Sequence, residues 1–263
     1  MSMRFVRIAL IGLIITLSTV TASAQQQPAE DFKNDTDPTQ PVLLSIREEF
    51  YNLQNDVWRN LVLLRMDKAF LRNRGWLGGK AGVITRFDLP LAASNAAGDT
   101  DIGLGDLYGQ FLYLPYLSKR FALAVGSGMF FPTATDQTLG SGKWKVAPLV
   151  APVWFIQPRK GYFLVKFQSV HSFAGSDTRP DTNVLLVTPT LLHRVKQRWW
   201  FLLDTEVKID WEQDGRTSFL SGVQVGHMFS RSFGLWVKPE VYWGSNRQGD
   251  WNLKLTMIWF RAR

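Results

Sequence analysis

The sequence predicts an all-β protein, an antiparallel up-and-down transmembrane β-barrel of about 12 strands. Three observations support this prediction. Segments with alternating polarity follow one another from about Trp58 to the end of the chain. In many of these segments one face is apolar with tryptophan near its ends, whereas the other face carries charged groups. The connections alternate between tight basic turns and longer, glycine-rich and mostly acidic loops.

The first segment, residues 1–24, has the composition of a secretory signal peptide. Arg4 and Arg7 precede an apolar run over residues 8–20, and residues 22–24 (Ala-Ser-Ala) supply a small-residue cleavage site. The alternative is a retained membrane anchor. It has weaker support because the apolar run is shorter than the roughly 18 residues of a spanning helix.

The next segment, residues 25–40, is polar and aperiodic, which predicts a flexible periplasmic leader. Residues 41–263 are expected to form the barrel. The chain has no cysteine, which excludes a disulfide framework and a thiolate metal site. Its formal charge of +8 would suit nucleic acid, but the cations are scattered singly in turns and on polar faces. With an export signal present, we predict no nucleic-acid partner.

The alternation is clearest in residues 198–211. One parity runs through apolar residues from Trp199 to Trp211. The opposite parity carries Asp204, Glu206, Lys208 and Asp210. A period of two indicates a β-strand, because successive side chains point to opposite faces. A charge facing lipid at the bilayer midplane would cost about 2–4 kcal/mol. We therefore expect the charged faces to point into the barrel.

Eleven segments share this pattern. The expected strands are 58–70, 76–91, 102–114, 119–132, 143–157, 160–173, 183–195, 198–211, 216–230, 232–243 and 251–260. A single-chain barrel needs an even number of strands with both ends in the periplasm. We therefore expect a twelfth strand at residues 41–51, although residues 43–50 also fit an amphipathic helical turn, and ten strands is the alternative.

Two details of these strands carry further expectations. Pro148, Pro152 and Pro239 lie inside expected strands and are predicted to mark bulges or kinks, because proline removes a ladder donor. The turns that contain Lys119 or Arg231 are short and basic. They are expected in the periplasm, with the longer acidic loops at the cell exterior.

Three segments carry a family resemblance. Residues 103–106 (G-L-G-D), 126–135 (G-S-G-M-F-F-P-T-A-T) and 139–144 (L-G-S-G-K-W) resemble the bacterial outer-membrane family named after the meta pathway of phenol degradation. The resemblance covers roughly residues 58–260. It implies an outer-membrane β-barrel that passes aromatic or other hydrophobic compounds, and it carries no catalytic residue over to this chain.

The predicted pathway consists of polar residues on the expected inward faces. These are Lys80, Arg86, Asp88, Asp106, Lys143, Lys145, Lys166, Gln168, Asp204, Glu206, Lys208, Asp210, Gln224, Lys238, Glu240 and Lys254. The predicted interfacial aromatic residues are Trp144, Trp154, Trp199, Trp211, Trp243, Trp251 and Trp259. Mixed charges in a lumen either line a conducting pore or pair into a closed interior.

Other chemistries have weaker support. Gly140-Ser141-Gly142-Lys143 lacks the Ser or Thr and the helix of a phosphate-binding loop. The three histidines are scattered, so we predict no metal site and no cofactor. Ser169 and His171 share one face near the expected outer rim, which leaves open a lipid hydrolase with a serine nucleophile. No third catalytic group is evident in the sequence.

The sequence therefore predicts a non-enzymatic, monomeric outer-membrane barrel of a Gram-negative bacterium. The expected function is that of a passive channel for small compounds, hydrophobic or aromatic ones among them. The alternatives are a closed structural barrel and the Ser169/His171 hydrolase. Expected partners are the outer-membrane lipid and lipopolysaccharide, a small-molecule permeant, and the barrel-assembly machinery. Trp259 and Phe260 near the C-terminus resemble the signal that this machinery recognises.

Overall fold

The computed structural model describes residues 42–72, 80–156, 160–195 and 198–260. The strands are β1 (Val42–Leu53), β2 (Trp58–Arg72), β3 (Lys80–Ser94), β4 (Asp101–Leu104), β5 (Leu107–Leu117), β6 (Phe121–Phe131), β7 (Lys143–Ile156), β8 (Gly161–Gly175), β9 (Asn183–Arg194), β10 (Trp199–Asp210), β11 (Arg216–Met228), β12 (Phe233–Trp243) and β13 (Gly249–Phe260). A short 3-10 turn, η1 (Trp211–Gln213), follows β10. No helix in these ranges is long and apolar enough to cross a membrane.

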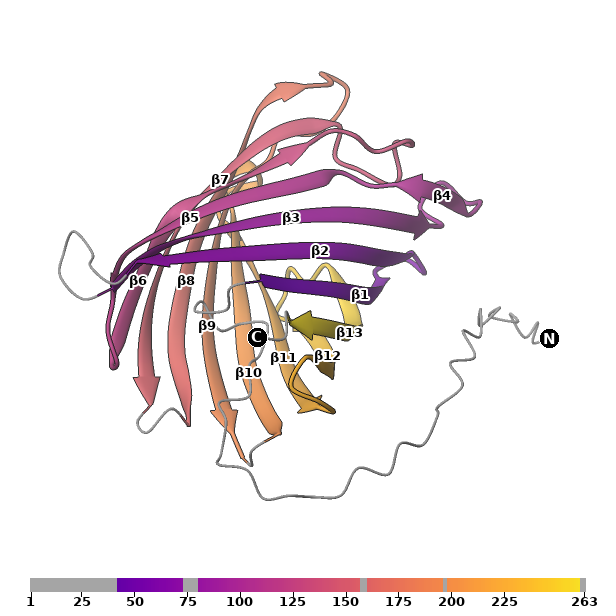
Figure 1. Cartoon of the computed structure of the whole chain (residues 1–263). Helices are drawn as coiled ribbons and strands as arrows, with labels where there is room; N and C mark the ends of the chain where they lie inside the picture. The colour runs from indigo at the N-terminus through magenta and orange to yellow at the C-terminus, as the bar shows by residue number, and fades with distance from the viewer. Residues whose placement is uncertain (1–41, 73–79, 157–159, 196–197, 261–263) are drawn as a thin grey trace. The chain divides into compact units, whose positions relative to one another are not determined.

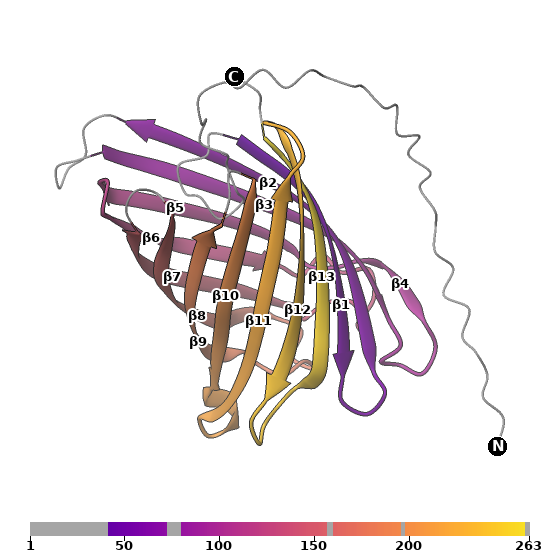
Figure 2. The same ribbon diagram turned by 90° about the horizontal axis from the view of Figure 1, so that it is seen from below.

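The strands form one closed antiparallel barrel, drawn in Figures 1 and 2. Consecutive strands are neighbours, β1 pairs with β13, and β2 pairs with β3, so the sheet has no open edge. The short β4 pairs with the end of β3, and β5 continues along the same strand after a break at residues 105–106. Counted in this way the barrel has 12 strands, as the alternating segments predict.

The first strand settles the strand count. Residues 42–53 form a strand that is paired along its length with both β13 and β2, so the helical-turn alternative and the ten-strand alternative are wrong. Burial alternates along it: Leu43 and Ser45 are almost fully buried, whereas Leu44 is exposed. The expected signal peptide and the expected leader lie outside the described residues.

Pairing with one neighbouring strand is interrupted, without a register shift, at Pro148, Pro152 and Pro239. In β7 the pairs with β8 stop beside Pro148 and Pro152 and resume in the same register. The β11–β12 pairing also has a gap beside Pro239 with no register shift. Proline cannot donate to the ladder, so the cost is a missing bond to one neighbour. The expected bulges are therefore absent at these three prolines.

The two faces of the barrel differ in chemistry. Outward-facing positions carry large exposed apolar side chains on many of the strands. Aromatic contacts gather near both ends of this outer surface. Trp199 contacts the His227 ring, and Phe233 contacts Trp259, in tilted geometry at the end with the short turns. Phe219 stacks on Trp243 at the end with the long loops. We call these the turn end and the loop end.

Candidate functional site

The middle of the barrel interior is crossed by ion pairs between neighbouring strands. Arg65 of β2 lies opposite Asp88 of β3 and donates two hydrogen bonds to it, at 2.7 and 2.6 Å. One step towards the turn end, Asp67 lies opposite Arg86 and accepts two bonds, at 2.7 and 3.0 Å. The charges alternate along and across the two strands, so each guanidinium meets a carboxylate in bidentate geometry.

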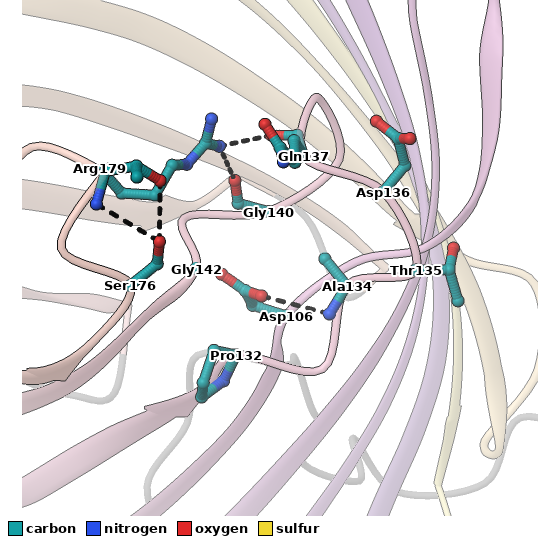
Figure 3. A pocket seen from close by; sticks show the side chains of 11 residues that line it. Asp106, Pro132, Ala134, Thr135, Asp136, Gln137, Gly140, Gly142, Ser176 and Arg179 are labelled. Carbon is teal, nitrogen blue, oxygen red and sulfur yellow. Dashed lines mark hydrogen bonds between the residues drawn. The ribbon is translucent and has the colours of Figure 1, made fainter.

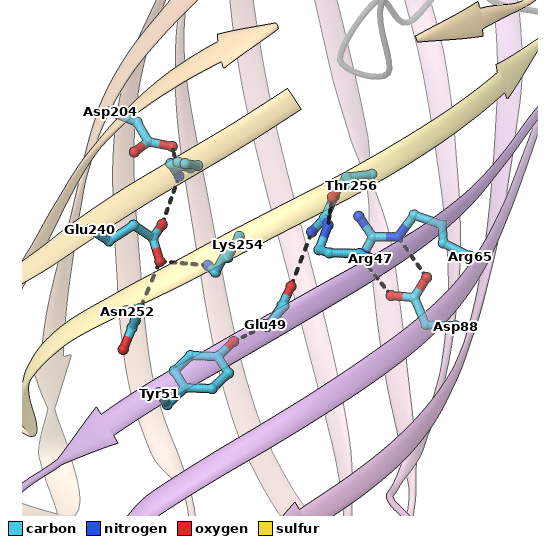
Figure 4. A network of polar contacts seen from close by, with 11 residues as sticks. Arg47, Glu49, Tyr51, Arg65, Asp88, Asp204, Glu240, Asn252, Lys254 and Thr256 are labelled. Atoms are coloured by element: carbon cyan, nitrogen blue, oxygen red, sulfur yellow. Dashed lines mark hydrogen bonds and ion pairs between the residues drawn. The ribbon is translucent and has the colours of Figure 1, made fainter. Parts of the chain in front are cut away.

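A second network links three strands on the other side of the closure, as Figure 4 shows. Lys238 of β12 contacts Asp204 of β10 at 2.7 Å and Glu240 of its own strand at 2.8 Å. Lys254 of β13 contacts Glu240 at 2.8 Å. Asn252 donates to the same carboxylate at 3.3 Å. The side chain of Glu240 is almost completely shielded from solvent, and these donors compensate its negative charge.

The first strand lies between the two networks and carries a third group of polar contacts. Glu49 accepts a hydrogen bond from the Tyr51 hydroxyl and pairs with Arg47 at 3.3 Å. The Arg47 side chain also donates to Thr256 of β13 at 3.1 Å. The predicted pathway does not include Arg47, Glu49, Arg65 or Asp67. Residues 41–51 alone fit either a strand or a helical turn, so their inward face does not follow from the sequence. Arg65 and Asp67 are inward charges of β2 that alternation along that strand could have identified.

The charged residues of the predicted pathway that belong to neither network, Asp106 apart, divide into three groups. Lys143 and Lys208 form ion pairs near the loop end, with Asp181 at 2.9 Å and Asp210 at 3.2 Å. Lys80 is exposed at the turn end of β3 and joins none of the described networks. Three other groups, Lys145, Lys166 and Glu206, are partly buried and make no ion pair with the described residues.

Two predicted polar residues are deeply buried. Gln168 of β8 is 8% exposed and Gln224 of β11 is 3% exposed. The side-chain nitrogen of Gln224 has no hydrogen-bond partner. Gln224 lies opposite Leu202, at the level where the interior changes from polar to apolar.

The turn end of the interior is lined by an apolar layer, which the predicted pathway does not include. We define this layer as Leu43, Leu117, Ala122, Val153, Tyr162, Leu192, Trp200, Leu202, Met228, Trp236, Ile258 and Phe260, which form one buried cluster. Trp200 is 3% exposed and Trp236 is 2% exposed. A side chain at Gly226 would overlap the Trp200 ring, so the glycine makes room for the indole.

The apolar layer had a signal in the sequence. The inward parity that carries Asp204 and Glu206 continues towards the turn as Leu202 and Trp200. The same change from polar to apolar residues occurs in β8, where Lys166 is followed by Leu164 and Tyr162 on the way to the turn. Reading each inward face as a gradient, rather than as uniformly polar, predicts an apolar floor at the turn end.

The loop end is partly covered by the β6–β7 loop, residues 132–142, which we call the clasp loop. It is held by Asp106 at the break between β4 and β5. The Asp106 carboxylate accepts hydrogen bonds from the backbone and hydroxyl of Ser141, both at 2.7 Å, and from the backbone of Ala134 at 3.3 Å. Figure 3 shows the loop closing around this carboxylate. The three segments that carry the family resemblance meet here.

Two arginines fix the clasp loop from other directions. Arg59 of β2 donates to the carbonyl of Leu139 at 2.7 Å, and Leu139 is completely buried. Arg179, in the β8–β9 loop, donates to the carbonyls of Gln137 and Gly140. Since β3 and β5 separate β2 from β6 in the barrel, the contact with Arg59 shows that the loop extends across part of the loop end.

A cavity of about 410 Å³ lies beside the clasp loop. Asp106, Asp136 and Arg179 contribute its charged lining. The amide and hydroxyl of Thr138 donate to Asp136 and lower the pKa of that carboxyl. The hydrogen bonds from Lys143 and Ser172 lower the pKa of Asp181 in the next loop. Both carboxylates are therefore ionised at neutral pH.

The residues of the hydrolase alternative lie on the outer surface. Ser169 Oγ and His171 Nε2 are 2.6 Å apart, within hydrogen-bonding distance. The second ring nitrogen of His171 has no hydrogen-bond partner among the described residues. Elsewhere on this surface Thr205 and Ser221 pair in a similar way at 2.8 Å. A hydrogen-bonded pair of this kind satisfies polar groups on an apolar face without any catalytic role.

The described residues offer no evident metal site. No group of three or more His, Asp or Glu residues in these ranges is arranged to hold a metal ion.

Comparison with known proteins gives a likeness of structure. No protein-family model matches the sequence, and a search of the curated proteins finds no match. An outer membrane channel from Pseudomonas putida F1 superposes with a TM-score of 0.69 at 12% identity, covering 90% of this chain and 100% of that one.

Two further solved structures are similar. The KdgM porin gives a TM-score of 0.54 at 8% identity, covering 84% of this chain and 99% of that one. The CymD monoaromatic hydrocarbon channel gives a TM-score of 0.51 at 8% identity, covering 87% of this chain and 92% of that one. The chain therefore has the fold of outer-membrane channel barrels, while its membership of the phenol meta-pathway family stays a prediction.

Proposed function

We propose that this protein is a passive channel of the bacterial outer membrane for small compounds. The observation that carries the proposal is the layered interior of a closed barrel with an apolar outer surface. A permeant would meet the clasp loop, then the paired charges, then the apolar layer. A compound with both polar and apolar parts suits this sequence of environments better than a hydrated ion does. Hydrophobic and aromatic compounds are the class that we propose.

The proposed orientation of the barrel in the membrane rests on the difference between its turn end and its loop end. The short basic turns would face the periplasm and the clasp loop would face the exterior, in contact with lipopolysaccharide. The exposed apolar side chains would meet lipid, and the aromatic residues near both ends would lie at its two interfaces. In this scheme the signal peptide directs export and the barrel-assembly machinery inserts the chain as a monomer.

Reconstitution in planar bilayers tests the channel. We expect small discrete conductance steps, since the apolar layer narrows the path for ions. We also expect proteoliposomes to take up a small aromatic compound faster than a sugar of similar mass. A protein that inserts, shows the heat-modifiable mobility of a folded barrel, and neither conducts nor admits either solute would be a closed structural barrel. The extensive interior ion pairs favour that alternative.

The 2.6 Å contact between Ser169 and His171 supports a second candidate, lipid hydrolysis. The test is release of fatty acid from detergent-dispersed phospholipid, with Ser169→Ala as the inactive variant. Ser221→Ala is the matched control, because Ser221 belongs to another outward-facing polar pair. We expect no release from any of the three proteins, because no described group orients the histidine. Release that Ser169→Ala alone abolishes would establish the hydrolase.

A further inference from the structure

Three inward-facing polar side chains lie in a row across neighbouring strands in the middle of the barrel. Lys166 of β8 lies opposite Thr188 of β9. The β9–β10 pairing on either side of Pro189 places Glu206 opposite Thr188, because Asp204 is paired with Thr190 and Val207 with Val187. Adjacent strands are about 4.8 Å apart, so the backbones of Lys166 and Glu206 are separated by roughly 10 Å.

This row is a gap in the paired interior. Lys166 and Glu206 carry opposite charges, yet they form no ion pair with each other in the described structure. Thr188 is only 9% exposed, and its hydroxyl has no hydrogen-bond partner. Nearby charges are satisfied at short range, as in the contact of Lys238 with Asp204 at 2.7 Å. Buried polar groups normally have partners, so an unpaired cation, hydroxyl and carboxylate in one row indicate a place for a ligand.

The row lies on the loop-end side of the apolar layer. Leu164 is the next inward residue of β8 towards the turn end and packs against the apolar layer. On β9 and β10 one further inward polar residue, Thr190 or Asp204, lies between the row and Leu192 or Leu202 of that layer. A ligand held by the polar row could therefore rest its apolar body on Leu164 and lose water-exposed apolar area.

We propose that Lys166, Thr188 and Glu206 form an internal binding site for small amphipathic acids that also carry a hydroxyl group. The ligand carboxylate pairs with the Lys166 ammonium. The ligand hydroxyl donates to the Glu206 carboxylate, and Thr188 bridges between them. The apolar body lies on Leu164. The inference rests on the proposed channel function and names a substrate class for it.

The site requires both polar groups of the ligand. A simple carboxylic acid leaves Glu206 without a donor, and a simple phenol or alcohol leaves Lys166 without an anion. An unpaired buried charge is costly, so each loss weakens binding. The site should therefore prefer a hydroxy acid to both simpler compounds, and this preference separates it from general attraction to a cation.

Binding is measurable without transport. Equilibrium dialysis of the detergent-solubilised barrel against labelled 4-hydroxybenzoate, benzoate and 4-hydroxybenzyl alcohol compares the three chemistries. We expect saturable binding of 4-hydroxybenzoate, weakened about tenfold or more by Lys166→Met. Glu206→Gln should remove most of the preference for 4-hydroxybenzoate over benzoate. Neither substitution breaks an ion pair of the described structure, and heat-modifiable mobility checks folding.

Lys145→Met is the matched control, because Lys145 is also an inward-facing lysine without an ion pair and lies nearer the loop end. We expect it to bind 4-hydroxybenzoate as the parent protein does. Equal losses in Lys145→Met and Lys166→Met would overturn the site in favour of a diffuse charge effect, and no saturable binding would overturn it outright. If the barrel binds 4-hydroxybenzoate but shows neither conductance nor uptake, the binding site is supported and the channel function is refuted. If the barrel conducts but does not bind 4-hydroxybenzoate, the channel function is supported and the binding site is refuted.

Discussion

Glu48 is an exposed carboxylate on the outer face of β1. It lies opposite Leu255 of β13 and Val62 of β2, midway between Trp251 and Trp259 along the outer face of β13. Its side chain accepts one hydrogen bond, from the Asn60 amide at 3.3 Å. The expectation that the charges of the strands all point inward is wrong at this residue. In a bilayer this position faces lipid, where an ionised carboxylate is unfavourable.

Replacing Glu48 should therefore stabilise the barrel in lipid. Glu48→Gln keeps the hydrogen-bonding shape and removes the charge, so we expect the free energy of unfolding to rise by about 1–2 kcal/mol. Reversible urea unfolding in phospholipid vesicles measures it. Lys68→Gln is the comparison, because Lys68 lies near the turn end of the same outer surface, where charge costs little. A Glu48→Gln variant that is no more stable than the parent would show that this carboxylate has a partner in the membrane.

At the scale of elements, the Asp106 carboxylate is one of the anchors of the clasp loop. Asp106→Ala removes the acceptor for both donors of Ser141 and for the Ala134 amide. We expect faster amide exchange throughout residues 132–142, with the barrel strands unchanged, because their ladders do not involve this side chain. Hydrogen–deuterium exchange with mass spectrometry measures the effect. Asp99→Ala, in a neighbouring loop, should leave exchange in the clasp loop as it is. Unaltered protection in Asp106→Ala would mean that the two arginines suffice.

The β8–β9 loop should respond to acid through Asp181. Its pKa in the folded protein is lowered by the hydrogen bonds from Lys143 and Ser172. The stabilisation is therefore complete above the unfolded pKa, near 3.9 for an aspartate, and is lost as the pH falls through the lower folded value. We expect amide protection of residues 176–182 to decrease only below about pH 4. Lys143→Met should shift this decrease to higher pH, and an unshifted profile would exclude the ion pair as its cause.

The elements themselves follow closely from the sequence. Alternation over β6 to β13 reflects a local rule, since each strand shows one face to the interior and one to the outside. The twelfth strand was predicted by the need for an even number, although residues 43–50 alone also fitted a helix. The sequence predicts bulges or kinks at Pro148 and Pro239, whereas the structure has gaps in the pairing there. A proline has no backbone N–H, and the neighbouring strand decides whether this causes a bulge or only an unpaired position. The residues of the proline's own strand do not determine the outcome.

At the scale of the whole molecule, the side-chain contacts inside the barrel are harder to predict from the sequence than the strands themselves. Parity identified most of the inward-facing charges but not their partners, because the stagger of the strands decides which side chains meet. Glu240 forms ion pairs with Lys238 of its own strand and with Lys254 of β13. The spacing along β12 indicates the first pair, but the second follows only from the pairing of β12 with β13. The buried apolar layer has a similar origin: it forms only when ten strands bring their last inward residues to the same level. The clasp loop explains why the G-L-G-D and L-G-S-G-K-W segments occur together, which sequence similarity alone does not.

The apolar layer should control the ion conductance of the whole barrel. If the layer is the main barrier to ions, then opening it should change conductance more than any change at the rim. Trp200→Ala combined with Trp236→Ala removes two indoles that are 3% and 2% exposed. We expect single-channel conductance in planar bilayers to rise severalfold, with a loss of stability of about 3–5 kcal/mol for each tryptophan. Trp199→Ala with Trp259→Ala removes two outward-facing indoles near the same end and should leave conductance at the parent level. If the inward pair folds and conducts no better than the outward pair, the barrier lies in the ion-pair networks, and removing the Lys238–Asp204 contact becomes the experiment that opens the pore.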